Sequence, residues 1–118
     1  MEDIRHTHFG QDGAVLVVAA PPQIGHDTAE PLVEHVRTHL PNREGAGVVL
    51  DLFGVALISS IGIASLLQIR ELCADRGAPL VLARVPEAQQ RFMRMLKLDR
   101  KFEFAPSVEE AVGAIERG

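Results

Sequence analysis

Two adjacent serines, Ser59 and Ser60, stand in an otherwise almost entirely apolar stretch, GVALISSIGIASLL at residues 54–67. A serine in front of a helix can cap it, because its oxygen accepts a hydrogen bond from an unpaired amide of the first turn. The same helix end can hold a phosphate, because its free N–H groups and partial positive charge attract anions. A phosphate adds about −1.5 to −2 charges, so it changes a binding surface without unfolding the helix. The pair is therefore a helix cap, through either serine, or a phosphorylation switch.

Asp51 also needs an explanation, because it interrupts the apolar stretch GVVLDLF at residues 47–53. A buried carboxylate without a partner is costly at neutral pH. We therefore expect Asp51 to lie at the end of a strand and to accept hydrogen bonds from loop amides. Direct contact with a partner protein is the alternative role.

Four histidines form two pairs whose placement bears on metal binding. His35 and His39 are four residues apart in an expected helix, a spacing that can bind a metal, and His6 and His8 share one face of an expected strand. No cysteine, aspartate or glutamate signature completes either pair, so we expect solvated or core histidines, no metal site and no cofactor. The sequence also contains no glycine-rich phosphate loop and no G-x-S-x-G nucleophile motif. We therefore expect a protein without enzymatic activity.

Charge and composition argue against several classes of function. The formal net charge is −4, whereas general binders of nucleic acids or anionic membranes normally have a basic surface. Tyr and Trp are absent, which leaves little aromatic surface on which bases could stack. One local basic cluster is expected to be a solvated helix face, or else a contact for an acidic partner; it comprises Arg91, Arg94, Lys97, Arg100 and Lys101.

Length and cysteine content indicate a single domain, residues 1–118, which is long enough to fold without metals or disulfides. Cys73 is the only cysteine, so an internal disulfide is impossible and a reducing cytosol is the natural compartment. The polar N-terminus lacks the apolar stretch of a signal peptide, and no apolar run approaches the roughly 18 residues of a membrane span. We expect a soluble, cytoplasmic protein with no nucleic-acid partner and no direct membrane insertion.

Segments typical of strands alternate with segments typical of helices. Apolar or β-branched runs bounded by turn residues predict strands over 4–9, 14–19, 47–53, 78–85 and 101–104. Helical spacing of apolar residues predicts a helix that begins with a capping box of Asp27 and Glu30 and ends at Pro41, and another over 60–75.

Two further helices are predicted in the C-terminal third. Pro86 opens one, whose expected apolar face consists of Ala88, Phe92, Met95 and Leu96. Ser107 and Glu110 form a capping box for the last, whose apolar residues are Val108, Ala111, Val112 and Ile115. The alternation predicts an α/β fold with a mixed central sheet, packed with about four helices. The serine loop should lie at the carboxyl ends of the parallel strands, where α/β proteins usually bind ligands and partners.

The stretch GVVLDLFGVALISSIGIASLLQI resembles the central motif of STAS domains, specifically of the bacterial anti-sigma factor antagonists. That motif has a strand ending in Asp and small residues, then Asp-Ser-Ser/Thr-Gly, then a Leu-rich helix. The similarity continues through RGAPLVLARV, RFMRMLKLDRKFEF and SVEEAVGAI. It covers residues 47–116 well and residues 1–46 only loosely.

The resemblance implies roles for individual residues of the loop. Ser60 matches the family's phosphorylated serine, and Gly62 matches the family's glycine in the first helical turn. Ser59 stands where the family usually has an aspartate, and Ile61 where it usually has a second Ser or Thr. The implied partner-binding residues are Ser59, Ser60, Ile61, Gly62 and Ile63. A small Gly62 would let a partner backbone approach, so on this interpretation Gly62→Leu weakens binding and leaves the domain folded.

The resemblance also implies a function. An antagonist of this family binds an anti-sigma factor with a serine-kinase fold and frees a sigma factor; the kinase phosphorylates the serine, and a PP2C-type phosphatase removes the phosphate. The expected protein is thus a non-enzymatic regulator, monomeric or weakly dimeric. The alternative is a STAS-like accessory subunit of a lipid-transport or larger signalling complex.

Overall fold

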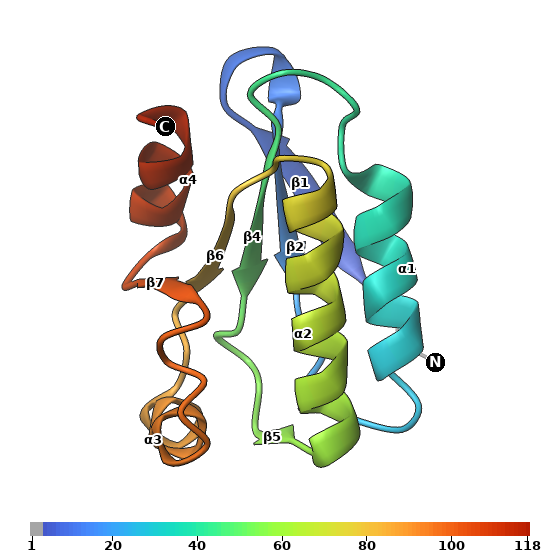
Figure 1. Ribbon diagram of the computed structural model, residues 1–118, viewed down its shortest axis with the longest axis vertical. Helices are drawn as coiled ribbons and strands as arrows, with labels where there is room; N and C mark the ends of the chain where they lie inside the picture. Colours follow the sequence, from blue (N-terminus) through green and yellow to red (C-terminus); the bar gives the residue numbers. More distant parts are fainter. Residues whose placement is uncertain (1–3) are drawn as a thin grey trace.

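The computed structural model describes residues 4–118 and centres on a five-stranded sheet in the order β1-β2-β4-β6-β7 (Figure 1). β1 runs antiparallel to β2, and the remaining neighbours are parallel. The strands are β1 (Arg5–Phe9), β2 (Val15–Ala19), β4 (Gly47–Asp51), β6 (Leu80–Ala83) and β7 (Glu103–Ala105). The expected mixed sheet is confirmed, and it begins with an antiparallel hairpin of β1 and β2.

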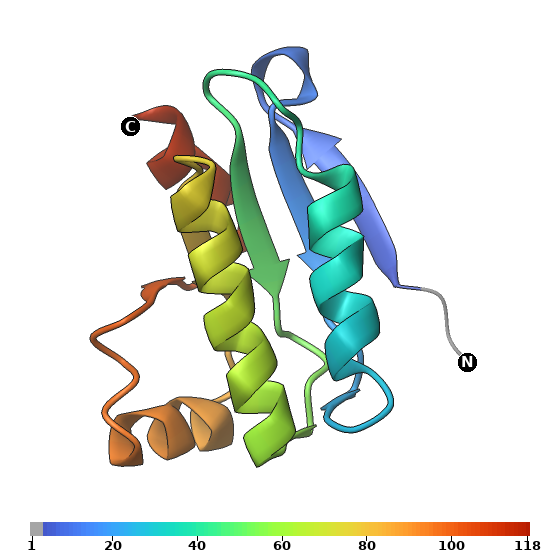
Figure 2. The same ribbon diagram turned by 45° about the vertical axis from the view of Figure 1, so that its right-hand side comes forward.

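Four α-helices pack around this sheet: α1 (Ala29–His39), α2 (Ser60–Asp75), α3 (Glu87–Met95) and α4 (Val108–Glu116). α1 and α2 lie side by side on one face, α4 lies on the other, and α3 lies beyond the carboxyl ends of the strands (Figures 1 and 2). The α/β fold predicted from the sequence is confirmed. Within residues 4–118, no helix is both long and apolar enough to cross a membrane.

The inner strands β2, β4 and β6 are almost entirely apolar because both of their faces are covered, whereas the edge strand β1 is mostly exposed. Alternate residues point to opposite sides. Leu16, Val18 and Leu50 belong to the core under α1 and α2, whereas Val17 and Val49 belong to a smaller core under α4. The sheet therefore has a helix layer on each side, with α1 and α2 on one face and α4 on the other.

A second, two-stranded sheet was not predicted. β3 (Gln23–Ile24) pairs in parallel with β5 (Leu57–Ile58), which ties the loop before α1 to the loop before α2. Two-residue strands carry no periodic signal, so the sequence pattern could not reveal them. They are important here because β5 leads directly into the serine pair.

The start of α1 differs from the predicted capping box. The helix begins at Ala29 after Thr28, and no side chain caps its first turn. The Thr28 hydroxyl instead accepts a hydrogen bond from the Gly25 amide and donates one to the Gln23 carbonyl. Asp27 is exposed and lies outside the helix. The predicted end before Pro41 is correct, since His39 is the last helical residue.

The buried side of α3 was also predicted incorrectly. Gln89 and Met93 are the buried residues of this helix, while Ala88, Met95 and Leu96 are exposed. The reason is that the Gln89 amide nitrogen donates to the carbonyl of Ala56, which draws a polar residue against the domain. The capping box of α4 is confirmed, because the Ser107 hydroxyl accepts from the Glu110 amide.

Candidate functional site

The serine loop connects the end of β4 to the start of α2 and lies at the carboxyl ends of the parallel strands, as predicted (Figure 2). β5 occupies the last part of this loop and pairs with β3. The amides of Ala56 and Leu57 both donate to the carbonyl of Pro22. The loop is therefore held by backbone hydrogen bonds on one side while its other side faces solvent.

Ser59 is the helix cap. Its hydroxyl oxygen accepts a hydrogen bond from the Gly62 amide at 3.2 Å and makes a longer contact, 3.4 Å, as a donor to the carbonyl of Ile24. The Ser59 amide donates to the same carbonyl at 3.0 Å. The choice between the two serines, which the sequence left open, is thus settled in favour of Ser59 as the cap.

Ser60 is the first residue of α2, and its side chain is exposed. Among residues 4–118, no hydrogen-bond partner is found for its hydroxyl. It stands at the positive end of a 16-residue helix, where unpaired amides and the helix dipole favour an anion. The two serines therefore have separate roles: one closes the helix end, and the other is free.

Gly62 is buried, contrary to its expected role as a surface on which a partner backbone could rest. A Cβ at this position would overlap with the carbonyl oxygen of Ile24 and would lie 2.8 Å from its carbonyl carbon. It would also lie 2.9 Å from Cγ2 of Ile58. The glycine is required so that α2 can pack closely against β3 of the same chain. The predicted tolerance of Gly62→Leu is therefore wrong.

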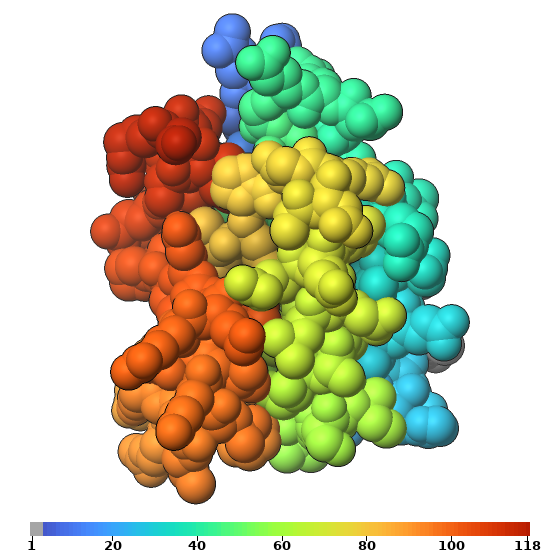
Figure 3. All heavy atoms as spheres, in the orientation of Figure 1, coloured from blue at the N-terminus to red at the C-terminus, as the bar shows by residue number. Residues whose placement is uncertain are grey.

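Apolar side chains that precede and follow Ser60 in the sequence are exposed. Phe53, Leu57 and Ile61 are 67%, 56% and 48% exposed. Ile63, the other predicted contact residue, is half-buried against the core. Ile61 also borders a groove of about 420 Å³ between α1 and α2. Figure 3 shows α3 beside the start of α2 at this same end of the molecule.

Asp51 lies at the end of β4, as predicted, and accepts a hydrogen bond from the amide of Phe53 at 3.2 Å. Its two carboxylate oxygens also accept hydrogen bonds from the guanidinium of Arg84, at 3.0 and 2.6 Å. The Arg84 guanidinium lies 4.3 Å from the ring centroid of Phe53. Asp51 therefore serves to hold the first residues of the loop, and sequence analysis missed its main partner, Arg84, because that residue follows a different strand.

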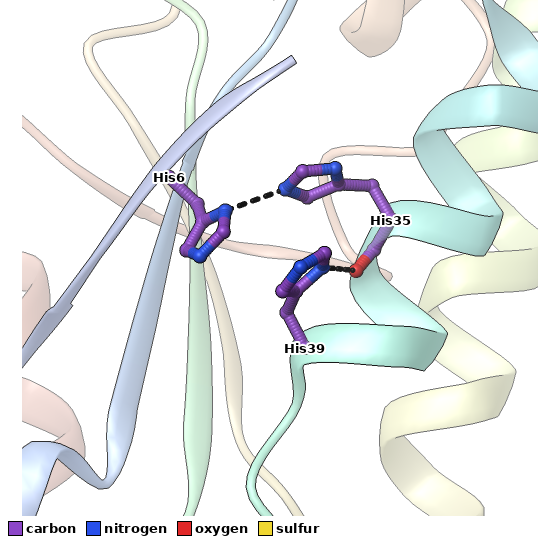
Figure 4. A group of neighbouring side chains, drawn as sticks. All are labelled: His6, His35 and His39. Atoms are coloured by element: carbon purple, nitrogen blue, oxygen red, sulfur yellow. Dashed lines mark hydrogen bonds between the residues drawn. The ribbon is translucent and has the colours of Figure 1, made fainter. Parts of the chain in front are cut away.

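Three histidines that the sequence placed in separate pairs lie together between β1 and α1 (Figure 4). His6 Nδ1 is 2.7 Å from His35 Nε2, and the rings of His35 and His39 are stacked 4.2 Å apart. Burial lowers the pKa of His6 and of His35, and the neighbouring His39 lowers both further. These two imidazoles are therefore mainly neutral near pH 7. The sequence signal was present in the two pairs, but only the tertiary structure joins them.

The remaining groups with reactive or charged side chains include Cys73, the other serines and the basic cluster. Burial raises the pKa of the Cys73 thiol to about 11, so it is not a reactive thiolate near neutral pH. Among residues 4–118, no serine hydroxyl is hydrogen-bonded to a histidine. The basic residues expected to be solvated are exposed, namely Arg91, Arg94, Lys97, Arg100 and Lys101.

Comparison with known proteins identifies the family. A family model described as "Mlab, STAS domain" matches residues 7–107. The chain belongs to the STAS domain family. The resemblance found in the serine loop is thereby confirmed for most of the chain.

Solved structures share the fold of this STAS domain. One is an anti-sigma-factor antagonist (STAS) domain protein from Planctomyces limnophilus, with a TM-score of 0.80, 20% identity, and coverage of 97% of this chain and 98% of that one. Another is an anti-sigma factor antagonist from Mycobacterium paratuberculosis, with a TM-score of 0.72, 23% identity, and coverage of 96% and 94%. A murine Solute Carrier 26 family anion transporter matches with a TM-score of 0.75 and 18% identity, over 89% of this chain but 18% of its own.

The separate roles of the two serines predict different effects on the stability of the STAS domain. Ser59→Ala removes the cap of α2 and is expected to lower the free energy of unfolding by about 1 kcal/mol. Ser60→Ala is the matched control, because it removes a hydroxyl that has no hydrogen-bond partner among residues 4–118. It should change the free energy of unfolding by less than about 0.5 kcal/mol. Urea unfolding followed by circular dichroism measures both. Equal losses in the two variants would contradict the assignment of the cap.

Proposed function

We propose that this STAS domain is a non-enzymatic regulator of the anti-sigma factor antagonist type. It binds a cytoplasmic anti-sigma factor with a serine-kinase fold through the loop before α2, and phosphorylation of Ser60 releases it. The observation that carries the proposal is that Ser60 is exposed and without a partner, while the adjacent Ser59 caps the helix. A kinase can therefore modify Ser60 without breaking the cap.

The surroundings of Ser60 support a surface for protein binding. Three apolar side chains of the same segment of the chain are exposed, namely Phe53, Leu57 and Ile61. A partner that covers these side chains removes them from water, which is the main source of affinity in such contacts. A phosphate on Ser60 would lose its water when the partner covers this surface, which is costly for a charged group. The phosphate would therefore weaken or prevent binding of the partner. The surface around Ser60 would thus bind the partner when Ser60 is unmodified and lose the partner when Ser60 carries a phosphate.

The aspartate that usually precedes the phosphorylated serine in this family is replaced here by Ser59. A neutral cap can occupy this place because the Ser59 hydroxyl both accepts from the Gly62 amide and contacts the Ile24 carbonyl as a donor. A carboxylate would have no proton to donate to that carbonyl. The neutral residue also leaves no negative charge beside an incoming phosphate.

Phosphorylation of the purified protein tests the proposal. The STAS domain is incubated with its co-purified or genomically adjacent kinase-fold protein and ATP, and the modified residue is located by mass spectrometry. We expect one phosphate, on Ser60, which persists in Ser59→Ala and is absent from Ser60→Ala. A PP2C-type phosphatase should remove it.

Phosphate on Ser59, or none at all with a kinase-fold protein that binds the domain, would contradict the proposal. Stable co-purification with a transporter ATPase in place of a kinase-fold protein would favour the alternative function, an accessory subunit of a transport complex.

A further inference from the structure

The three histidines His6, His35 and His39 come from two elements that meet at the edge of the sheet (Figure 4). One ring nitrogen from each lies within 4.8 Å of the others. Among residues 4–118, no other group of at least three histidine, cysteine or acidic side chains is close enough to hold a metal ion. We propose that this cluster, called here the histidine cluster, binds one divalent transition-metal ion, with zinc as the best match.

The fold directs these side chains toward one another. β1 pairs with β2 so that His6 lies beside Val18, whose side chain is in the core under α1 and α2. Paired residues of neighbouring strands share a face, so His6 also projects toward α1. His35 and His39 are four residues apart in α1 and therefore lie on one side of the helix. The strand β1 thus supplies one ligand, and the helix α1 supplies two.

One of the three rings, that of His39, is held by a hydrogen bond that also sets its tautomer. His39 Nδ1 lies 2.9 Å from the carbonyl oxygen of His35, which can only accept, so Nδ1 carries the proton. The lone pair of His39 is therefore on Nε2. In metal-binding histidines, the N–H of the second ring nitrogen commonly donates a hydrogen bond to a carbonyl in this way. This hydrogen bond holds the ring and sets its tautomer.

The distances fit a metal ion after small side-chain movements. Zinc binds imidazole nitrogen at about 2.0–2.1 Å, which places tetrahedral ligands about 3.3 Å apart. His6 Nδ1 and His35 Nε2 are now 2.7 Å apart and share a hydrogen, which the metal would replace. Three nitrogen ligands and no carboxylate match zinc and its neighbours in the first transition series, and do not match Mg²⁺ or Ca²⁺. Water would complete the coordination.

The histidine cluster is separate from the loop that carries Ser60. It lies toward the C-terminal end of α1, whereas the serine loop lies at the opposite end of the helix layer (Figure 1). A metal ion here would cross-link the edge strand β1 to α1. Binding should therefore stabilise the fold and leave phosphorylation of Ser60 unchanged.

Titration of the full, tag-free chain with ZnCl₂ by calorimetry tests the proposal. We expect one ion per chain and a rise in Tm of at least about 5 °C at 100 times the dissociation constant. Mg²⁺ and Ca²⁺ should give no rise. Cobalt(II) should produce the visible absorption bands of a tetrahedral site. Each of His6→Gln, His35→Gln and His39→Gln should weaken zinc binding at least tenfold.

His26→Gln is the matched control, because His26 is exposed and precedes α1 at the other end of that helix. It should bind zinc as the wild type does. Circular dichroism confirms that each variant is folded, and nitrogen-15 shifts of the wild-type imidazoles report ligation without any substitution. Absence of a 1:1 complex, an equal loss in His26→Gln, or unchanged imidazole shifts on saturation would overturn the proposal.

Discussion

Gly62→Leu is expected to unfold the domain or to leave it marginally stable. Any side chain at this position meets the carbonyl group of Ile24, and this carbonyl is held by the amide of Ser59. The backbone cannot move aside as a flexible side chain would, so α2 must separate from β3. We expect the free energy of unfolding to fall by at least about 3 kcal/mol, a large part of the 5–15 kcal/mol typical of a domain.

Gly54→Leu is the matched control for this prediction. Gly54 lies in the same loop, and a Cβ there would meet no atom within 4 Å. The same substitution should therefore change the free energy of unfolding by less than about 0.5 kcal/mol. Urea unfolding of both variants makes the comparison. A Gly62→Leu protein as stable as Gly54→Leu would show that α2 does not pack against β3 as closely as described.

Ser60→Asp is expected to abolish most partner binding while the domain stays folded. A carboxylate in the first turn of α2 interacts favourably with the helix dipole, so stability should be unchanged or slightly higher. The same charge must be desolvated when the partner covers the exposed side chains of Leu57 and Ile61. Affinity for the kinase-fold partner should fall at least tenfold, which corresponds to about 1.4 kcal/mol.

Ser60→Asn separates the effect of charge from that of size, because asparagine has nearly the shape of aspartate and no charge. It should lose clearly less affinity than Ser60→Asp, and Ser60→Ala should bind constitutively in the presence of ATP. Calorimetric titration at two salt concentrations measures all three. If Ser60→Asp and Ser60→Asn bind equally well, a charge at this position does not control the complex.

The sequence alone was sufficient to predict the longer strands and the four helices, because these depend on short-range patterns, but it did not reveal the two-residue strands β3 and β5. The apolar stretches that became β2, β4 and β6 are covered on both faces and therefore have no polar alternation. The predicted end of α1 before Pro41 and the predicted capping box of Ser107 and Glu110 are also confirmed. Proline geometry and cap hydrogen bonds involve residues only a few positions apart.

Other features depended on contacts between distant segments, and the sequence could not predict them. The capping serine is identified by the Gly62 amide together with the carbonyl of Ile24, which belongs to a strand too short to have a pattern. The need for glycine at position 62 arises from that same carbonyl.

The histidine cluster depended even more on tertiary structure. His6 is separated from His35 by 29 positions, and only the antiparallel register of β1 and the placement of α1 bring their ring nitrogens to 2.7 Å. Sequence spacing determines which residues share a face of one element. The packing of elements against one another decides which of those faces meet, because that choice depends on how the whole core is buried.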